Sequence, residues 1–134
     1  MVGYKEINRE IDVKSVYDGN VVRALLFSSE NEPNRHIVRS ALAIAKSQKG
    51  GEYHFHPDTD EVYYIIDGEG VVELEDKSIS VSPDNCINIP RNTKHRIRSI
   101  GRSDLKYIAF HIADADFYGA VVHQPIDNDV SDGK

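Results

Sequence analysis

Short segments rich in β-branched and aromatic residues recur along this chain, with turn signals between them and almost no stretch of helical period. Gly, Pro, Asn and Asp mark the turns, as in the run Asp67-Gly68-Glu69-Gly70. The segments that we expect to be strands are residues 21–28, 37–45, 61–66, 71–75, 78–81, 86–89, 95–100 and 105–112. About eight strands at this spacing, with no helices between them, are typical of an antiparallel sandwich or barrel. We therefore predict an all-β fold.

Two of these segments, residues 41–45 and 107–112, are apolar on both faces. A strand with one face in water alternates between apolar and polar residues, so we expect both of these strands to be covered twice. The second cover could be another layer of the same chain or a second subunit. We therefore expect a homodimer.

The chain has 134 residues, which suits a single domain. We expect the core barrel to span about residues 21–113, and residues 124–134 to form a polar, flexible tail. The formal charge of −6 repels phosphate backbones, which argues against a nucleic-acid partner. No apolar run approaches the roughly 20 residues that span a bilayer, so we expect no membrane partner.

The first residues show neither a basic nor an apolar leader segment, so we expect no secretory signal. Cys86 is the single cysteine, which excludes a disulfide within the chain and suits a reducing compartment. Together these features predict a cytoplasmic protein. Because Cys86 begins an apolar segment, we expect its side chain to be buried.

The segment His54-Phe55-His56-Pro57 carries the clearest chemical signal. On a strand, positions i and i+2 share a face, so His54 and His56 project together and suit a divalent metal ion. Pro57 ends that strand, and Glu61 opens the next one opposite the histidines. A further donor, His95, follows a turn into another expected strand. Three nitrogens and one carboxylate oxygen would leave open positions on an octahedral ion.

These spacings resemble the two motifs of the cupin superfamily. The first motif has His-x-His, three or four residues, Glu, six residues and Gly, and His54, His56, Glu61 and Gly68 stand at those positions. The second motif has Pro, Gly two residues later and His three residues after that. Pro90, Asn92 and His95 occupy these positions.

The resemblance covers roughly residues 36–112 and implies a double-stranded β-helix, or jelly roll. It also implies that the metal ligands are His54, His56, Glu61 and His95. The chain departs from the motifs at three glycine positions, which hold Gln48, Asp84 and Asn92, and at the late Asn, which is Ser99. No departure removes a ligand.

Parity along the strands selects further candidates for the pocket. Tyr63 shares the face of Glu61, and Tyr107 and His111 share one face of the last strand. We propose these three as catalytic residues, with the tyrosines orienting a substrate or acting as acids. The alternatives are that both tyrosines belong to the core and that His111 is an interface or capping residue.

Basic residues cluster around the second motif. Alternation puts Arg96 and Arg98 on the face opposite His95, where we expect a solvated outer surface. Arg91 and Lys94 lie in a loop at the mouth of the expected barrel, where they could attract an anionic substrate. The remaining histidines, His36 and His123, stand at no ligand spacing, and we expect both to be structural.

The resemblance leaves the reaction open, because the family contains dioxygenases, isomerases, decarboxylases, lyases and binding proteins. We favour a metal-dependent dioxygenase or related oxidoreductase that acts on a small polar molecule. The alternatives are a metal-dependent isomerase or lyase, and a non-catalytic module that binds a small sugar or acid. The expected cofactor is a divalent ion of iron, manganese, nickel or zinc.

Overall fold

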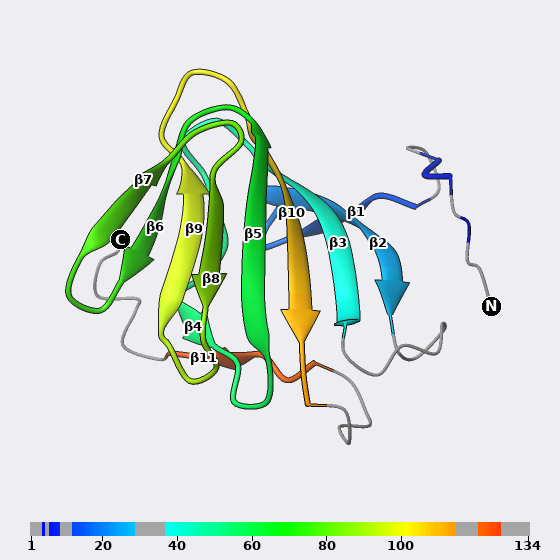
Figure 1. Ribbon diagram of the computed structural model, residues 1–134. Coiled ribbons are helices and arrows are strands. Elements are labelled where there is room, and N and C mark those ends of the chain that lie inside the picture. The colour runs from blue at the N-terminus through cyan, green and yellow to red at the C-terminus, as the bar shows by residue number, and fades with distance from the viewer. Residues whose placement is uncertain (1–3, 5, 9–11, 29–36, 115–120, 127–134) are drawn as a thin grey trace.

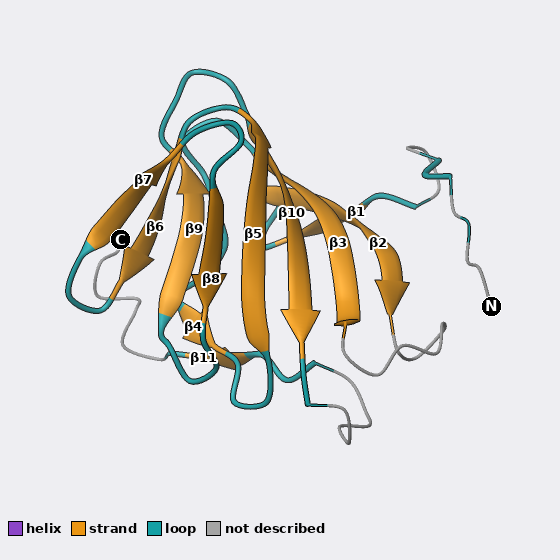
Figure 2. Ribbon diagram, in the orientation of Figure 1, coloured by secondary structure: helices purple, strands orange, loops and turns teal. Residues whose placement is uncertain are grey.

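The computed structural model describes residues 4, 6–8, 12–28, 37–114 and 121–126, and these form eleven strands and no helix (Figures 1 and 2). The strands are β1 (Lys14–Val16), β2 (Val21–Ser28), β3 (Ile37–Ala45), β4 (His54–Phe55), β5 (Asp60–Asp67), β6 (Gly70–Leu74), β7 (Ser78–Val81), β8 (Cys86–Ile89), β9 (His95–Ser99), β10 (Leu105–Ile112) and β11 (Gln124–Pro125). Each predicted strand is present, with bounds that differ by at most one residue at either end.

The strands form two antiparallel sheets, which is the arrangement of a jelly roll. The larger sheet has six strands in the order β1-β2-β3-β10-β5-β8, and the smaller has five in the order β11-β4-β9-β6-β7. The core lies between the sheets, and its buried members are Val21, Ala43, Ala45, Tyr63, Ile65, Val72, Val81, Ile89, Ile97, Leu105, Tyr107 and Ala109. The predicted fold class is therefore confirmed.

The outer face of the larger sheet is only half-covered. Along β10 the residues alternate between buried and half-buried, with Tyr107 inside and Phe110 outside. On the outside of β3, Leu42 and Ile44 line a surface pocket together with Ile7 and Val13 from the N-terminal segment. Part of the second cover that the sequence predicts is thus supplied by the chain itself.

Three short strands lie outside the eight predicted segments: β4, which the His54-x-His56 motif places on a strand, and β1 and β11, which no sequence argument predicts. β1 and β11 have three and two residues, too few for a periodic pattern to appear in the sequence. β11 pairs with β4, in register Gln124 with Phe55 and Pro125 with His54. The expected tail therefore begins as a strand beside the histidine motif, and residues 127–134 lie outside the described part of the chain.

All three positions where the chain departs from the glycines of the cupin motifs have left-handed backbone conformations. Gln48, Asp84 and Asn92 have φ angles of 63°, 71° and 66°. An L-residue pays roughly 1–2 kcal/mol for this conformation, whereas glycine adopts it freely. Gly68, at a motif position that keeps its glycine, has a φ of 92°. At these three positions the chain therefore adopts a backbone conformation that a glycine would adopt without cost.

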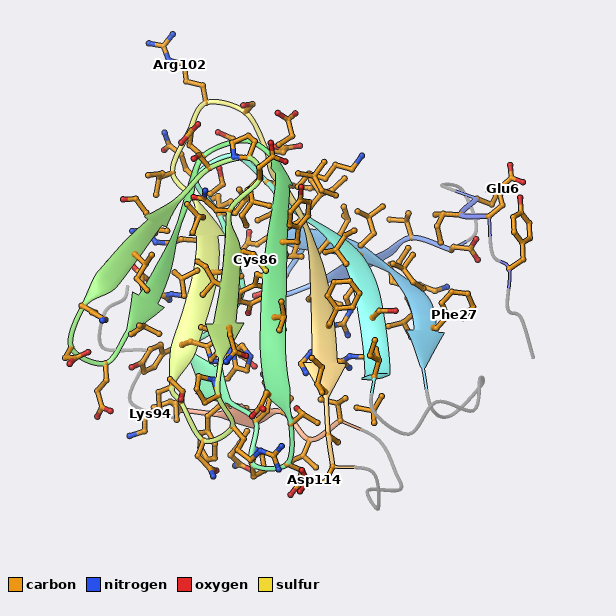
Figure 3. All side chains as sticks on the ribbon, viewed as in Figure 1. Glu6, Phe27, Cys86, Lys94, Arg102 and Asp114 are labelled. Carbon is orange, nitrogen blue, oxygen red and sulfur yellow. The ribbon has the colours of Figure 1, made fainter. Side chains whose placement is uncertain are left out.

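Cys86 is exposed, which corrects the expectation that it is buried (Figure 3). It opens β8, an edge strand of the larger sheet, where Ile89 is buried and Cys86 has the opposite parity to it. Among the described residues, no helix is long and apolar enough to cross a membrane.

Candidate metal centre

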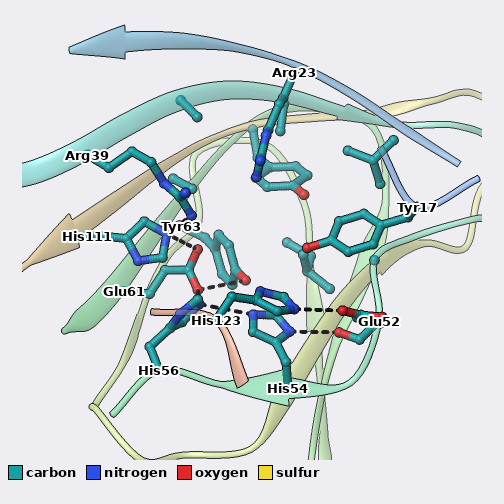
Figure 4. A pocket seen from close by; sticks show the side chains of 17 residues that line it. Tyr17, Arg23, Arg39, Glu52, His54, His56, Glu61, Tyr63, His111 and His123 are labelled. Atoms are coloured by element: carbon teal, nitrogen blue, oxygen red, sulfur yellow. Dashed lines mark hydrogen bonds and ion pairs between the residues drawn. The ribbon is translucent and has the colours of Figure 1, made fainter. Parts of the chain in front are cut away.

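Strand register gathers the candidate ligands at one end of the barrel. In the smaller sheet, His54 of β4 pairs directly with His95 of β9. In the larger sheet, Glu61 of β5 pairs with His111 of β10. His56 follows β4 by one residue. Because the two sheets face each other, these side chains meet inside the barrel. Figure 4 shows His54, His56, Glu61 and His111 among them.

The four sequence-predicted ligands are brought together, and all of them are buried. One donor atom from each of His54, His56, Glu61 and His95 lies within 4.8 Å of the others. The Nε2 atoms of His54 and His56 are 3.0 Å apart. Glu61 Oε1 lies 2.9 Å from His95 Nε2 and 3.3 Å from His56 Nε2. This separation suits atoms that share one small cation.

Main-chain carbonyl oxygens orient the three imidazoles. Each histidine places its Nδ1 within hydrogen-bond distance of such an oxygen, and because a carbonyl can only accept, each Nδ1 carries the proton. The pairs are His54 with Glu52 at 2.7 Å, His56 with Val122 at 2.7 Å, and His95 with Thr93 at 2.8 Å. In the neutral rings the Nε2 lone pairs therefore point at one another and at Glu61.

This convergence of lone pairs fits a metal ion. Two neutral Nε2 acceptors cannot hydrogen-bond to each other, and a carboxylate oxygen adds a further acceptor beside them. Burial lowers the pKa of His54 to about 2, with the nearby His95 acting in the same direction, so His54 stays neutral at ordinary pH. A divalent cation bound by these atoms would satisfy all of them.

Glu61 is held as a carboxylate. Burial by itself raises the pKa of Glu61, but the surrounding histidines, His111 foremost, bring it well below its ordinary value. Its second oxygen, Oε2, lies 3.1 Å from His111 Nε2. Tyr63 donates a hydrogen bond to Oε1 at 3.2 Å. Two of the three proposed catalytic side chains thus contact the candidate ligand directly.

Tyr63 and Tyr107 both line the cavity beside the ligands and are almost fully buried. Their rings pack edge to face, with centroids 5.4 Å apart. Burial and the negative charge of Glu61 raise the pKa of both phenols, so both keep their protons. They are therefore part of the core and part of the cavity wall at once.

The cavity is small, at about 50 Å³, and its wall also includes residues that the sequence analysis did not place at the site. These are Tyr17, Arg23, Arg39, Glu52 and His123. Figure 4 shows Arg23 and Arg39 reaching in from the strands of the larger sheet, with Tyr17 and Glu52 on the other side.

His123 lines the cavity, a position that the expectation of a structural residue did not include. Its ring stacks on His54, with centroids 4.1 Å apart, and its Nε2 lies 2.7 Å from a carboxylate oxygen of Glu52. His36, the other histidine expected to be structural, lies outside the described residues.

Two basic residues of the second motif, Arg91 and Lys94, lie outside the cavity wall. Arg91 pairs with Asp60 at 3.1 Å and Asp114 at 3.4 Å, and Lys94 lies 3.8 Å from Glu75. Neither lines the cavity, although Lys94 and Asp114 lie at the same end of the barrel as β4 and β11 (Figure 3). Carboxylates thus partner both residues outside the cavity wall, and their attraction of an anionic substrate stays a prediction.

Arg96 and Arg98 lie on the outer face, as alternation predicts. His95, Ile97 and Ser99 are buried, and the two arginines between them are half-buried. Both bind Glu73 of β6, with Arg96 at 2.7 Å and Arg98 at 3.1 Å. They belong to a surface ion-pair cluster outside the barrel.

Comparison with known proteins identifies the family. The model of a family described as "Cupin domain" matches residues 42–111, more than half of the chain. The chain belongs to the cupin superfamily. An uncharacterized protein of Methanocaldococcus jannaschii is 33% identical to this cupin over 114 residues, which are 81% of this chain and 87% of that protein.

Solved structures share the cupin fold. The crystal structure of a predicted oxalate decarboxylase from Thermotoga maritima matches with a TM-score of 0.70 at 26% identity, over 78% of this cupin and 94% of that chain. The polyketide cyclase RemF of Streptomyces resistomycificus matches with a TM-score of 0.69 at 17% identity, over 92% of this cupin and 86% of that chain. Proteins with different names thus share the cupin fold.

Strand alternation could have predicted one of the cavity residues that the sequence analysis of this cupin missed. Arg39 has the same parity as Ala41, Ala43 and Ala45, whose side chains face the interior, so strand alternation places it inside. Tyr17 and His123 lie outside the predicted strands, where no periodic pattern points to the cavity.

Proposed function

We propose that this cupin is a metal-dependent enzyme whose cavity takes a small polar molecule beside one divalent metal ion. The proposed ligands are His54, His56, Glu61 and His95. The observation that carries the proposal is the convergence of their acceptor atoms, with each Nδ1 already committed to a main-chain carbonyl. Iron, manganese, nickel and zinc all accept imidazole nitrogen and carboxylate oxygen.

When bound, such an ion supplies Lewis-acid polarisation of a substrate oxygen and, if it is iron, oxygen chemistry. The side chains of this cupin would hold protons near the substrate and donate hydrogen bonds to it. Tyr63 and Tyr107 have raised pKa values and keep their protons, so they can donate hydrogen bonds to the oxygen atoms of a substrate. His111 orients the second oxygen of Glu61.

The first candidate reaction is that of a dioxygenase or related oxidoreductase, which suits a site with three imidazoles, one carboxylate and open positions. The second is a metal-dependent isomerase or lyase. The two protonated phenols beside the cavity favour this second class, because isomerisation and elimination need a proton held close to the reacting carbon or oxygen. A module that binds without turnover is the third candidate.

One experiment separates these classes. The protein, purified without a metal-affinity tag, is analysed for metal and incubated with a panel of small acids and sugars in air and under nitrogen. Oxygen consumption coupled to product formation supports the oxidoreductase, whereas equal product under nitrogen supports the isomerase or lyase. Saturable binding with no product in either gas would replace both with the binding module.

We further propose that the protein is a cytoplasmic homodimer with no nucleic-acid or membrane partner. The outer face of the larger sheet supports the dimer, since Tyr64 is 38% exposed and Ile66 is 36% exposed on β5. Light scattering at micromolar concentration should give twice the chain mass of 15.1 kDa. A mass of one chain would refute the dimer.

A further inference from the structure

A groove outside the barrel carries an excess of positive charge. Among the described residues that line it, three are basic, Lys49, Arg96 and Arg98, and one is acidic, Glu73. The chain as a whole has a formal charge of −6, so the sign of this groove is opposite to that of the protein. Glu73 shares its one carboxylate between both arginines, and the groove therefore keeps a positive charge that attracts a further anionic group.

Main-chain hydrogen bonds fix the groove beside β9. The carbonyl of Lys49 accepts a hydrogen bond from the Ser99 amide at 2.8 Å, and the Gly51 amide donates to the Ile97 carbonyl at 3.3 Å. Between them, Gly50 lies so close to β9 that a Cβ atom on it would clash with that strand. The basic side chains of the groove thus project from a single well-connected piece of the smaller sheet.

The chain leaves β11 beside this groove. β11 pairs with β4, and β4 pairs with β9 (Figure 1). The Ile126 amide, just beyond β11, donates to the Tyr53 carbonyl at 3.2 Å. Because His54 pairs with His95, the preceding Tyr53 stands beside Arg96 in the same register. Ile126 is therefore two strand spacings, about 10 Å, from the backbone of β9.

The sequence that follows β11 has the charge that the groove attracts. Because β11 is antiparallel to β4, an extension of β11 beyond Ile126 would run towards residues 50–51 of the groove. Residues 127–134 lie outside the described part of the chain, and their sequence contains one lysine and three aspartates, Asp127, Asp129 and Asp132. At about 3.3 Å per extended residue, Asp129 can reach about 10 Å from Ile126. The length of the segment therefore brings its carboxylates within reach of the arginines.

We propose that the acidic segment of residues 127–134 binds in this groove and holds β11 against β4. An exposed ion pair is weak, but the tether keeps the segment at a high effective concentration beside several cations. β11 has only two residues, and the chain just before it supplies the Val122 carbonyl that orients His56 and the His123 ring that stacks on His54. The segment thus holds these two residues in place from outside the barrel. Its effect on the ligands rests on the proposed metal centre, whereas its binding in the groove does not.

Crosslinking with a water-soluble carbodiimide tests the contact, because this reagent joins a carboxylate directly to a neighbouring amine. In the full chain at low salt, mass spectrometry should identify links between Lys49 and the aspartates of residues 127–134. These links should fall at least about fivefold at about 0.5 M salt, which screens exposed charges. They should also fall in the double variant Arg96→Gln, Arg98→Gln, whereas the link between Lys94 and Glu75, which lie 3.8 Å apart, should remain.

Two crosslinking results would overturn the proposal. The first is the absence of links from Lys49 to residues 127–134 at low salt. The second requires an equal mixture of isotope-labelled and unlabelled chains, in which links mainly between the two kinds would show that the occupant of the groove belongs to a second copy.

Amide hydrogen exchange tests whether the segment holds β11. The Ile126 amide should exchange at least about tenfold faster in the triple variant Asp127→Asn, Asp129→Asn, Asp132→Asn, because its bond to Tyr53 then opens more often. The matched control is Glu6→Gln, Asp67→Asn, Asp76→Asn, which removes the same charge from exposed positions elsewhere and should leave the rate unchanged. Equal rates in the wild type and the first variant, or the same acceleration in the control, would refute the proposal. Both measurements use metal-free protein, so their failure leaves the metal centre standing, and a protein that takes up no metal leaves this inference standing.

Discussion

The Nε2 atoms of His54 and His56 face each other at 3.0 Å, while the Nδ1 atom of each ring lies 2.7 Å from a main-chain carbonyl oxygen. The carbonyls fix the ring tautomers, and the short strand β4 fixes their common direction. A pair of neutral imidazoles gains nothing from this contact without a cation. A bound cation would therefore turn an unfavourable contact between acceptor atoms into a favourable one.

The metal-free protein should lose stability as the pH falls from 7 to 5. The folded pKa of His54 is about 2, far below the ordinary 6.5, so between these values the unfolded chain binds a proton that the folded chain does not. The free energy of unfolding then falls with pH, by at most about 1.4 kcal/mol per pH unit for one histidine. Urea titrations at the two pH values measure the effect.

His54→Gln is the matched variant for this measurement, because an amide does not titrate. The fall between pH 7 and 5 should be smaller in this variant than in the wild type. Equal wild-type stability at both pH values would show that the buried imidazole is not kept neutral by the fold.

Tyr63→Phe should weaken metal binding by about tenfold while leaving the packing intact. The substitution removes the hydroxyl that donates to Glu61 Oε1 and keeps the ring that packs on Tyr107. The free energy of unfolding should change by only about 1 kcal/mol. Competition with a chromogenic chelator measures the affinity.

Tyr107→Phe removes a hydroxyl from the same wall and should leave metal affinity unchanged. We expect it to affect ligand binding or turnover instead. If both exchanges leave metal affinity, ligand affinity and turnover unchanged, the tyrosines act only in packing, and their proposed catalytic role is wrong.

Gln48→Gly should stabilise the protein by about 0.5–1 kcal/mol. Gln48 is exposed and has a φ of 63°, so glycine relieves a strained backbone, and the greater freedom of glycine in the unfolded chain offsets part of the gain. Gln48→Ala keeps the strain and serves as the control. Thermal unfolding measures both, and a destabilised glycine variant would contradict this account of the turn.

Local patterns in the sequence predict the strands and the ligand set but only part of the cavity. Alternation places Glu61 and Tyr63 on one face, and motif spacing gathers His54, His56 and His95, because these depend on short stretches of chain. His123 reaches the site from a segment without periodicity, and its neighbour Glu52 precedes β4. Such contacts depend on how the strands are paired.

The clearest error of the sequence analysis concerns an outward-facing residue of β8. Cys86 begins a segment that includes Ile87 and Ile89, and an apolar run of this kind predicts burial. β8 is the last strand of the larger sheet, and only the inward residues of this strand meet the core. Cys86 shares the outward face of the exposed Asn88, so the alternation that turns Ile87 and Ile89 inwards decided the exposure of Cys86.

The central claim is tested most directly by the metal content of His56→Ala. After loading with iron(II), manganese, nickel or zinc and desalting, the wild type should retain about one ion per chain. His56→Ala should retain far less while its circular dichroism stays that of a β protein, because the barrel does not need the ion to fold. His123→Phe, which keeps a ring beside His54, should retain the ion. Full occupancy in His56→Ala, or no retained ion in the wild type, would contradict the metal centre.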